Sequence, residues 1–530
     1  MAYIKKQSFG KGVLILLCSQ IIIKLLGAIY RIVITRIEGF GDIGNSYYGA
    51  AYQIYTVLLA ISTVGIPSAL AKLVAEKAAV NDIKGAHRIF KTALGLFSII
   101  GLLGSTIMLA FGEALANLIS NPGVKYSLWS LSPSIFFIAI ASVIRGYFQG
   151  FCDMKPQANS QIIDQMGKCF FTILLAYSFV GKSPEIMSAA ATFGATIGTI
   201  MSVAYVIYYY QKRKKDIWAD AKKGRKSSVE TRKRIIRNIL VLSIPITFGA
   251  IITSISGMVN VLTVMPRLLD AGFSELQAQT WYGMLVGKSD VLLNLPLALN
   301  VVYATSLVPN VASALALKDE KTAAKKIEFS IFSTIVITLP AAIGLSVLAD
   351  PILEVIFKGV SEGGYIIKVS AFSIIFIALT QTLSGALQGM GRVYTPAIAL
   401  FVGAVVKYLM NYILVAIPEI NIMGATYSAI ACYFISFTIS FTILRKNIKL
   451  NIPLGKYLVK PVIASTIMGF VAYYSNDIIF NISQSKLIAL ILAIGLAMIT
   501  YGGLLILMRI LNKEEMNAIP VVGKYIAKIL

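Results

Sequence analysis

The sequence predicts an all-α integral membrane protein, and three observations support that fold class. Of the 530 residues, 57% are apolar and only 14% are charged, whereas soluble domains have about 25% charged residues. The mean hydropathy is +0.78. Apolar runs recur along the whole chain, most of them near the roughly 20 residues that a spanning helix needs. Such a chain cannot cover its apolar surface by folding on itself, so most of it is expected to lie in a bilayer.

Apolar runs separated by polar breaks predict fourteen transmembrane helices. The eighth run is long enough to continue beyond the bilayer, and the thirteenth is short for a span. The first run follows a basic N-terminus without a small-residue cleavage site, which favours a retained first span over a signal peptide. The predicted spans are 12–37, 47–71, 92–111, 128–151, 158–180, 187–211, 238–266, 281–317, 329–348, 369–390, 395–417, 422–444, 461–475 and 487–508.

The distribution of charge predicts the orientation of these spans. The chain has 48 Lys and Arg against 24 Asp and Glu. If the N-terminus is inside, the inner loops hold 35 basic and 11 acidic residues, and the outer loops hold 6 and 11. Basic loops stay on the cytoplasmic side of a membrane. We therefore predict a multi-pass cell-membrane protein with both termini cytoplasmic, whose basic excess needs no nucleic-acid partner.

One inner loop, 212–237, carries 12 of those 35 cations. It is interpreted as a cytoplasmic linker lying on anionic membrane lipids. Docking of an anionic substrate or of a partner is the alternative.

A sequence duplication predicts two lobes. The pattern GxxQG occurs at 146–150 and at 385–389, an offset of 239 residues, and the same offset separates Lys168 from Lys407. Upstream, the prolines of GIPSALAKL and LVPNVASAL are 242 residues apart, at Pro67 and Pro309. Because the offset spans six helices, an even number, the two repeats are expected to have the same orientation and to be related by an axis along the membrane normal.

The duplication sets the predicted domains. The N-lobe is 1–211 with spans 1–6, the basic linker is 212–237, and the C-lobe is 238–445 with spans 7–12. Residues 446–530 hold spans 13 and 14 and a cytoplasmic tail. Two such lobes are expected to leave a central cleft for substrate, and the protein is expected to be a monomer.

Charged residues within spans are costly and point to function. Seven cations lie within the predicted spans against two acids, Asp164 and Asp290. The excess positive charge predicts an anionic ligand. Two other interpretations stay open: Arg36 can extend to the interface, and Asp164 can neutralise Lys168 four residues later. The predicted substrate-binding residues are Lys24, Arg31, Arg145, Lys168, Lys288, Asp290 and Lys407.

Other classes of site find little support in the sequence. The four cysteines show no CxxC spacing and the only histidine is His87, so neither a metal site, a disulfide nor a His-based catalytic triad is predicted. No phosphate-binding GxxxxGK[ST] pattern occurs. We therefore expect no cofactor and no catalytic residues, with transport driven by an ion gradient, the membrane potential or another protein.

The segments IIIKLLGAIYRIVITRIEGFGDIGNSYYGAAYQIYTVLLAISTVGIPSALAKLVAE (21–76) and DVLLNLPLALNVVYATSLVPNVASAL (290–315) carry a family resemblance. They resemble the stage V sporulation protein B and polysaccharide-transporter branch of the MOP flippase superfamily, which also includes the MurJ lipid II flippases and the MATE exporters. The resemblance implies a V-shaped pair of lobes with a cationic cavity. It also implies transport of an undecaprenyl-pyrophosphate-linked glycan by alternating access.

The resemblance also bears on single residues. Lys24 and Arg31 match the cavity-facing arginines of the first MurJ span, in a Lys-Leu-Leu-Gly context. The MurJ arginine of span 2 has no counterpart in 47–71, and the position of the span 8 arginine is Val291, three residues after Lys288. The head group is therefore expected to be held differently from that of lipid II in MurJ.

The predicted function is a flippase for a lipid-linked oligosaccharide, such as a lipid II-like peptidoglycan precursor, in cell-wall or spore-cortex synthesis. The alternatives are a transporter for another lipid-linked polysaccharide of the O-antigen or teichoic type, and a MATE-like cation exporter. A polyprenyl-phosphate glycosyltransferase would need acidic catalytic residues in a large outer loop. The longest outer loop, 349–368, has only about 20 residues, so an enzyme is not predicted.

Overall fold

The computed structural model describes residues 9–60, 66–223, 230–358 and 361–510. These residues form helices joined by turns, and no strand occurs in the ranges just given, so the predicted all-α fold class is confirmed. Nine helices are long and apolar enough to cross a membrane among the residues described. The count of fourteen spans stays a prediction, although the described residues of each of the fourteen runs fall on a helix or on consecutive helices.

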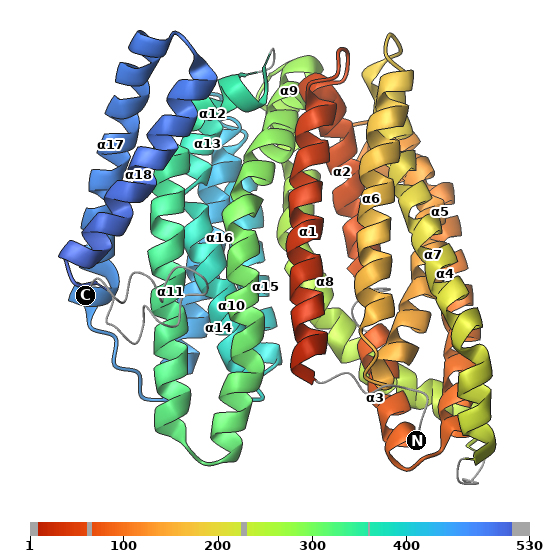
Figure 1. Cartoon of the computed structure of the whole chain (residues 1–530). Helices are drawn as coiled ribbons and strands as arrows, with labels where there is room; N and C mark the ends of the chain where they lie inside the picture. Colours follow the sequence, from red (N-terminus) through yellow and green to blue (C-terminus); the bar gives the residue numbers. More distant parts are fainter. Residues whose placement is uncertain (1–8, 61–65, 224–229, 359–360, 511–530) are drawn as a thin grey trace. The chain divides into compact units, whose positions relative to one another are not determined.

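The chain divides into two compact units, Met1–Gly287 and Lys288–Leu530. Figure 1 shows both as bundles of long helices. Unit 1 contains α1 (Phe9–Thr35), α2 (Gly41–Ala60), α3 (Ile66–Ala79), α4 (Ile83–Leu118), α5 (Val124–Gly150), α6 (Lys155–Ser178), α7 (Pro184–Lys223), α8 (Arg232–Asp270) and α9 (Glu275–Met284). A π-helical turn, η2 (Leu285–Ser289), follows α9.

Unit 2 is a second helical bundle. It contains α10 (Asp290–Ala316), α11 (Glu320–Val347), α12 (Ala349–Ile356), α13 (Gly364–Ser370), α14 (Ser373–Gly389), α15 (Tyr394–Leu414), α16 (Met423–Asn447), the π-helical turn η3 (Gly455–Val459), α17 (Lys460–Ser483) and α18 (Lys486–Leu507).

The glycines of the first GxxQG pattern mark a close helix contact in unit 1. A Cβ at Gly146 would lie 2.8 Å from the carbonyl oxygen of Pro67 on α3, and one at Gly150 would lie 2.8 Å from that of Ala71. Only residues without a side chain let the backbones of α5 and α3 approach so closely.

The second GxxQG pattern makes the equivalent contact in unit 2. A Cβ at Gly385 would lie 2.2 Å from the carbonyl oxygen of Ala304, and one at Gly389 would lie 2.7 Å from that of Val308. Packing therefore pairs Pro67 with Ala304, an offset of 237 residues. The sequence match of Pro67 to Pro309 is therefore out of register by five residues. Two similar apolar segments can be aligned at several offsets when only their sequences are compared, and the packing contacts select one of these offsets.

The order of helix packing also repeats. In unit 1, α5 packs against α3, α4 and α7, and α6 packs against α7. In unit 2, α14 packs against α10, α11 and α16, and α15 packs against α16. The helices α8 and α9 pack against α2 in unit 1, so the assignment of 238–287 to a C-terminal lobe stays a prediction, as does the symmetry axis.

The basic linker is helical at both ends. The helix α7 continues to Lys223 and α8 begins at Arg232, and residues 224–229 lie outside the described ranges. Glu230 accepts a hydrogen bond from Lys77 at 2.5 Å, and its carbonyl accepts one from Arg88 at 3.3 Å. These contacts fix the start of α8 against the connection between α3 and α4.

A cysteine at position 227 tests the orientation of the chain. In a Ser227→Cys variant whose four native cysteines are replaced by alanine, we expect no labelling by an impermeant maleimide added to whole cells. Labelling should appear once the membrane is permeabilised, because basic loops stay on the cytoplasmic side. Labelling of intact cells at the rate seen for a cysteine at Ser183, in a predicted outer loop, would overturn the topology.

Candidate functional site

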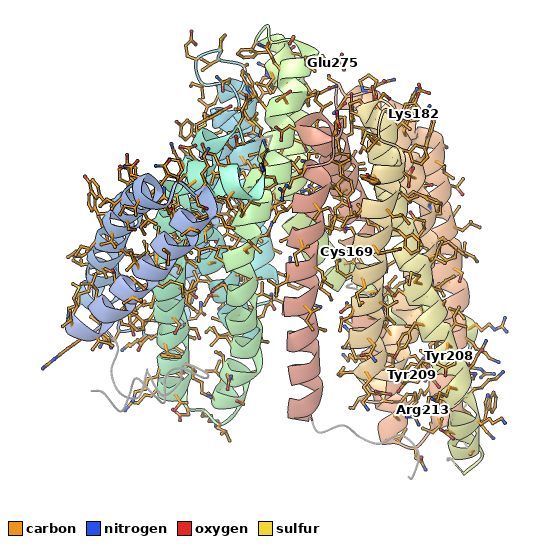
Figure 2. All side chains as sticks on the ribbon, turned by 45° about the horizontal axis from the view of Figure 1, so that its top comes forward. Cys169, Lys182, Tyr208, Tyr209, Arg213 and Glu275 are labelled. Atoms are coloured by element: carbon orange, nitrogen blue, oxygen red, sulfur yellow. The ribbon has the colours of Figure 1, made fainter. Side chains whose placement is uncertain are left out.

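The site is built on the contact between α1 and α6 in unit 1. Gln20 donates a hydrogen bond to Gln161 at 3.1 Å, and the Cys169 thiol donates to the carbonyl of Leu26 at 3.3 Å. Figure 2 labels Cys169 about halfway along α6. These contacts hold the cationic helix α1 alongside α6 over several turns.

A row of tyrosines lies next to this contact. Tyr48, Tyr52 and Tyr55 follow one another on one face of α2, where residues three or four apart are neighbours. The ring centroids of Tyr48 and Tyr52 are 5.9 Å apart in a stacked arrangement, and those of Tyr52 and Tyr55 are 5.6 Å apart. From α1, Tyr30 joins the row through a 3.2 Å contact between its hydroxyl and that of Tyr48.

Arg31 lies against the first tyrosine of this row. Its guanidinium carbon is 4.5 Å from the ring centroid of Tyr48, and its Nη2 donates to the carbonyl of Val286 at 3.1 Å. Its Nη1 is buried and has no hydrogen-bond partner in the described part of the chain. A buried guanidinium nitrogen without an acceptor is costly, and an acceptor group on a ligand would satisfy it.

Lys168 on α6 lies on two other tyrosines of this group, Tyr52 and Tyr30. Its ammonium nitrogen is 3.8 Å from the ring centroid of Tyr52 and 5.1 Å from that of Tyr30, and its side chain is only 5% exposed. Cation–π contacts with desolvated cations contribute about 2 kcal/mol. The tyrosine row therefore stabilises two positive charges within one unit, and we call Arg31, Lys168, Tyr30, Tyr48 and Tyr52 the tyrosine–cation cluster.

Asp164 and Arg145 form a polar group beside the cluster. Arg145 on α5 is 5% exposed. It donates to the hydroxyl of Ser160 at 2.8 Å and to that of Ser202 at 2.6 Å. Asp164 interacts electrostatically with both Arg145 and Lys168. Arg145 thus connects α5 to α6 and α7, and its geometry is that of a structural crosslink.

Replacing Arg145 with leucine is expected to lower the stability of the purified protein by about 3 kcal/mol. The cause is that breaking a buried charged network leaves its partners uncompensated. Thermal unfolding in detergent measures the effect. Replacing Asp164 with leucine in the same chain should recover part of the loss, since removing both charges is much less costly than removing one. Unchanged stability with lost transport would instead make Arg145 a substrate ligand.

Other predicted site residues do not belong to the tyrosine–cation cluster. Lys24 and Arg36 are exposed on and just beyond α1, whereas Arg31 is half-buried. In unit 2, Lys288 is 1% exposed and donates to the carbonyl of Glu362 at 2.9 Å.

Asp290 and Lys407 belong together in unit 2. Lys407 is 3% exposed and interacts electrostatically with Asp290. The structure thus pairs this acid and this lysine within unit 2.

The tyrosines are the part of the site that the sequence reasoning missed. Their signal was present as Tyr48, Tyr52 and Tyr55, spaced four and three residues apart in a predicted span. Tyrosine spacing on a membrane helix is ordinarily interpreted as packing or as an interfacial belt. Only the approach of Arg31 and Lys168 from other helices gives these rings a role in binding charge.

Known proteins resemble this chain in sequence and in fold. The model of the family described as polysaccharide biosynthesis protein matches residues 9–315, and the MatE model matches residues 292–413. Stage V sporulation protein B of Bacillus subtilis (strain 168) is 26% identical over 525 residues, which are 99% of this chain and 100% of that protein.

MurJ proteins are similar in sequence and in fold. The lipid II flippase MurJ of Bacillus subtilis (strain 168) is 22% identical over 478 residues, 87% of each chain. The structure of a lipid II flippase MurJ in its inward closed conformation superposes with a TM-score of 0.70 at 17% identity, covering 93% of this chain and 98% of that one.

These matches confirm the family resemblance carried by the segments 21–76 and 290–315. The protein is a multi-pass membrane protein, and its relatives include flippases. Because the family model covers more than half of its length, the chain belongs to the polysaccharide biosynthesis protein family.

Proposed function

We propose that the protein is a flippase that moves an undecaprenyl-pyrophosphate-linked glycan from the inner to the outer leaflet by alternating access. A lipid II-like peptidoglycan precursor, used in cell-wall or spore-cortex synthesis, is the proposed cargo. The family and its relatives support transport. The observation that carries the choice of an anionic cargo is Arg31, whose guanidinium is held on Tyr48 and whose buried Nη1 finds no acceptor among the described residues.

The chemistry of the tyrosine–cation cluster matches a pyrophosphate. Arginine presents a planar set of donors that suits phosphate oxygens, and lysine supplies a point charge. A hydrogen bond to a charged group contributes about 1.5–3 kcal/mol, so several donors together offset part of the cost of removing a pyrophosphate from water. In this proposal Arg31 contacts the pyrophosphate, exposed Lys24 attracts it along α1, and Lys168 supports the local positive potential.

Proteoliposomes test the proposal directly. Purified protein is reconstituted with lipid II carrying a fluorophore on its head group, and an impermeant reductant added outside reports the fraction of fluorophore in the outer leaflet. We expect complete bleaching with the protein and about half bleaching without it. Bleaching equal to that of empty vesicles, for lipid II and for other pyrophosphate-linked glycans alike, would contradict the proposal.

A second candidate follows from the MatE match to residues 292–413. A MATE-like exporter would move organic cations, and a cationic dye loaded into the same vesicles measures that activity. The positive charge of Arg31 and Lys168 disfavours a cationic cargo in unit 1.

A teichoic or O-antigen type of glycan is the other alternative cargo. Offering each lipid-linked glycan in turn in the bleaching assay distinguishes it from a lipid II-like precursor.

A further inference from the structure

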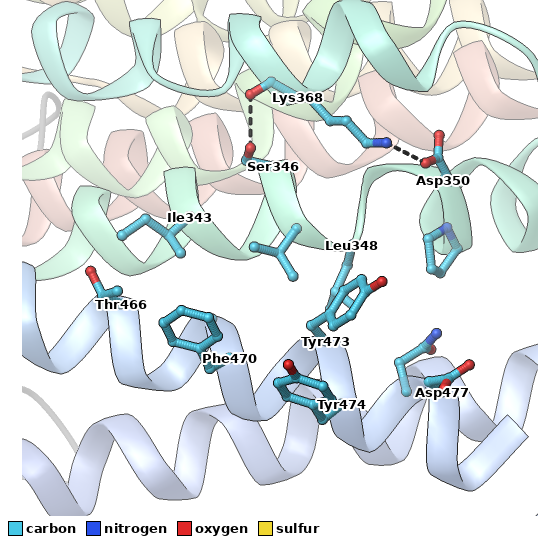
Figure 3. A pocket seen from close by; sticks show the side chains of 14 residues that line it. Ile343, Ser346, Leu348, Asp350, Lys368, Thr466, Phe470, Tyr473, Tyr474 and Asp477 are labelled. Carbon is cyan, nitrogen blue, oxygen red and sulfur yellow. Dashed lines mark hydrogen bonds and ion pairs between the residues drawn. The ribbon is translucent and has the colours of Figure 1, made fainter.

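Unit 2 has a pocket of about 630 Å³ that the proposed transport does not use. It lies where the end of α11 and the start of α12 face α17 (Figure 3). Its volume lies within the range of small-molecule sites, roughly 300–1,000 Å³. A Cβ at Gly469 of α17 would lie 2.7 Å from the side chain of Ile343, so α17 sits close against α11 at the apolar floor of the pocket.

The ionisable side chains that line the pocket are one lysine and two aspartates. Lys368 of α13 forms an ion pair with Asp350 of α12 at 2.6 Å, and Figure 3 shows this pair at one side of the pocket. Asp477 lines the opposite side from α17, and no cation of the described residues lies within ion-pair distance of it. The lining therefore has a net charge of −1, in a chain whose net charge is +24.

The remaining polar groups favour a ligand that donates hydrogen bonds. The Oδ1 of Asn476 is buried and has no hydrogen-bond partner in the part of the chain that is described. The side chains of Tyr473 and Tyr474 also line the pocket, and tyrosine faces attract cations. An ammonium group has three N–H donors and a positive charge, so it matches a carboxylate, a free amide oxygen and aromatic rings at once.

The surroundings of the pocket favour a lipid as the carrier of that ammonium group. Phe470 and Tyr474 on α17 are 60% and 59% exposed, as expected of side chains that face acyl chains. Both Asp477 and Lys368 fall in predicted outer loops, at the level where tyrosines are enriched and lipid head groups lie. An acyl chain can extend along α17 while the head group occupies the pocket.

We propose that this pocket binds the ammonium head group of an outer-leaflet phospholipid. Asp477 and Asn476 accept its N–H groups, and Tyr473 and Tyr474 lie beside its charge. The ion pair of Asp350 with Lys368 lines the opposite side of the pocket. The proposal is independent of the pyrophosphate cargo, because the tyrosine–cation cluster lies in unit 1 and selects the opposite charge.

Native mass spectrometry of the full-length protein tests this site. Affinities are measured for phosphatidylethanolamine and phosphatidylglycerol with identical acyl chains. We expect the ethanolamine lipid to bind about tenfold more tightly. Asp477→Asn should weaken ethanolamine-lipid binding about fivefold, without changing the thermal unfolding of the protein, because Asp477 is exposed. Glu419→Gln is the matched control: it removes another exposed acid of unit 2, outside the pocket, and should leave lipid binding unchanged.

Lys368→Gln is the most informative variant, because removing this positive charge should change the binding of a cationic ligand and of an anionic ligand in opposite directions. It frees Asp350 and makes the lining more negative, so binding of the ethanolamine lipid should become about threefold tighter. A loss of binding in Lys368→Gln, or equal binding of the two lipids to the wild type, would overturn the proposal. Free ethanolamine that binds as tightly as the lipid would show that a soluble amine, and no lipid, is the ligand.

Discussion

Replacing Arg31 with alanine is expected to abolish transport of a pyrophosphate-linked glycan in the bleaching assay, by about 100-fold or more in rate. The variant removes the guanidinium that lies on Tyr48 and donates to the carbonyl of Val286. It also removes the buried Nη1 that has no acceptor in the described protein. The charge-assisted contact of Nη1 with the pyrophosphate contributes about 1.5–3 kcal/mol, and its loss, together with the loss of the positive charge, accounts for such a reduction.

The conservative variant separates charge from geometry. Arg31→Lys should restore only part of the rate, because an ammonium keeps the charge but lacks the planar set of donors. Lys24→Ala should weaken transport at unchanged expression. Arg36→Ala is the matched control, since Arg36 is an exposed cation just after the end of α1, and its effect should be mild. Full rates in both Lys24→Ala and Arg31→Ala would refute the cationic binding site.

Replacing Gly385 with leucine is expected to prevent stable folding of unit 2. A Cβ at this position would lie 2.2 Å from the carbonyl oxygen of Ala304, and a backbone carbonyl cannot move away as a flexible side chain can. The added atoms force α14 away from α10, and overpacking of a close contact costs about 1–3 kcal/mol or more. We expect a lower unfolding temperature in detergent and a larger aggregated fraction in size-exclusion chromatography.

The duplication supplies a second test of the same kind. Gly146→Leu should have a comparable effect in unit 1, where a Cβ would lie 2.8 Å from the backbone of Pro67. Gly495→Leu on α18 is the matched control, because a Cβ there meets no atom of the described residues within 4 Å outside the backbone of its own helix. If Gly385→Leu and Gly146→Leu unfold at the same temperature as Gly495→Leu, then the close helix contacts do not limit stability.

Much of the fold could be predicted from the chain itself. The lipid bilayer imposes one strong rule, that a span be helical, apolar and about 20 residues long, and apolar runs reveal this directly. The glycines of the two GxxQG patterns, which predicted the duplication, lie at close helix contacts in both units, because only glycine permits the backbone approach seen at Gly146 and Gly385. The residues of α3 and α10 that face these glycines could not be predicted. The match of Pro67 to Pro309 placed the equivalent residue of α10 five positions away from Ala304.

The site required the tertiary structure. The sequence by itself determined that cations lie within the spans, and it singled out Lys24, Arg31, Arg145, Lys168, Lys288 and Lys407 without distinguishing their surroundings. The fold alone decided that the serines around Arg145 take up its donors, that Lys288 is held by a backbone carbonyl, and that Arg31 and Lys168 share one row of tyrosines. The physical reason is that burying a charge is costly unless it is compensated, and the compensating groups come from helices far apart in the sequence.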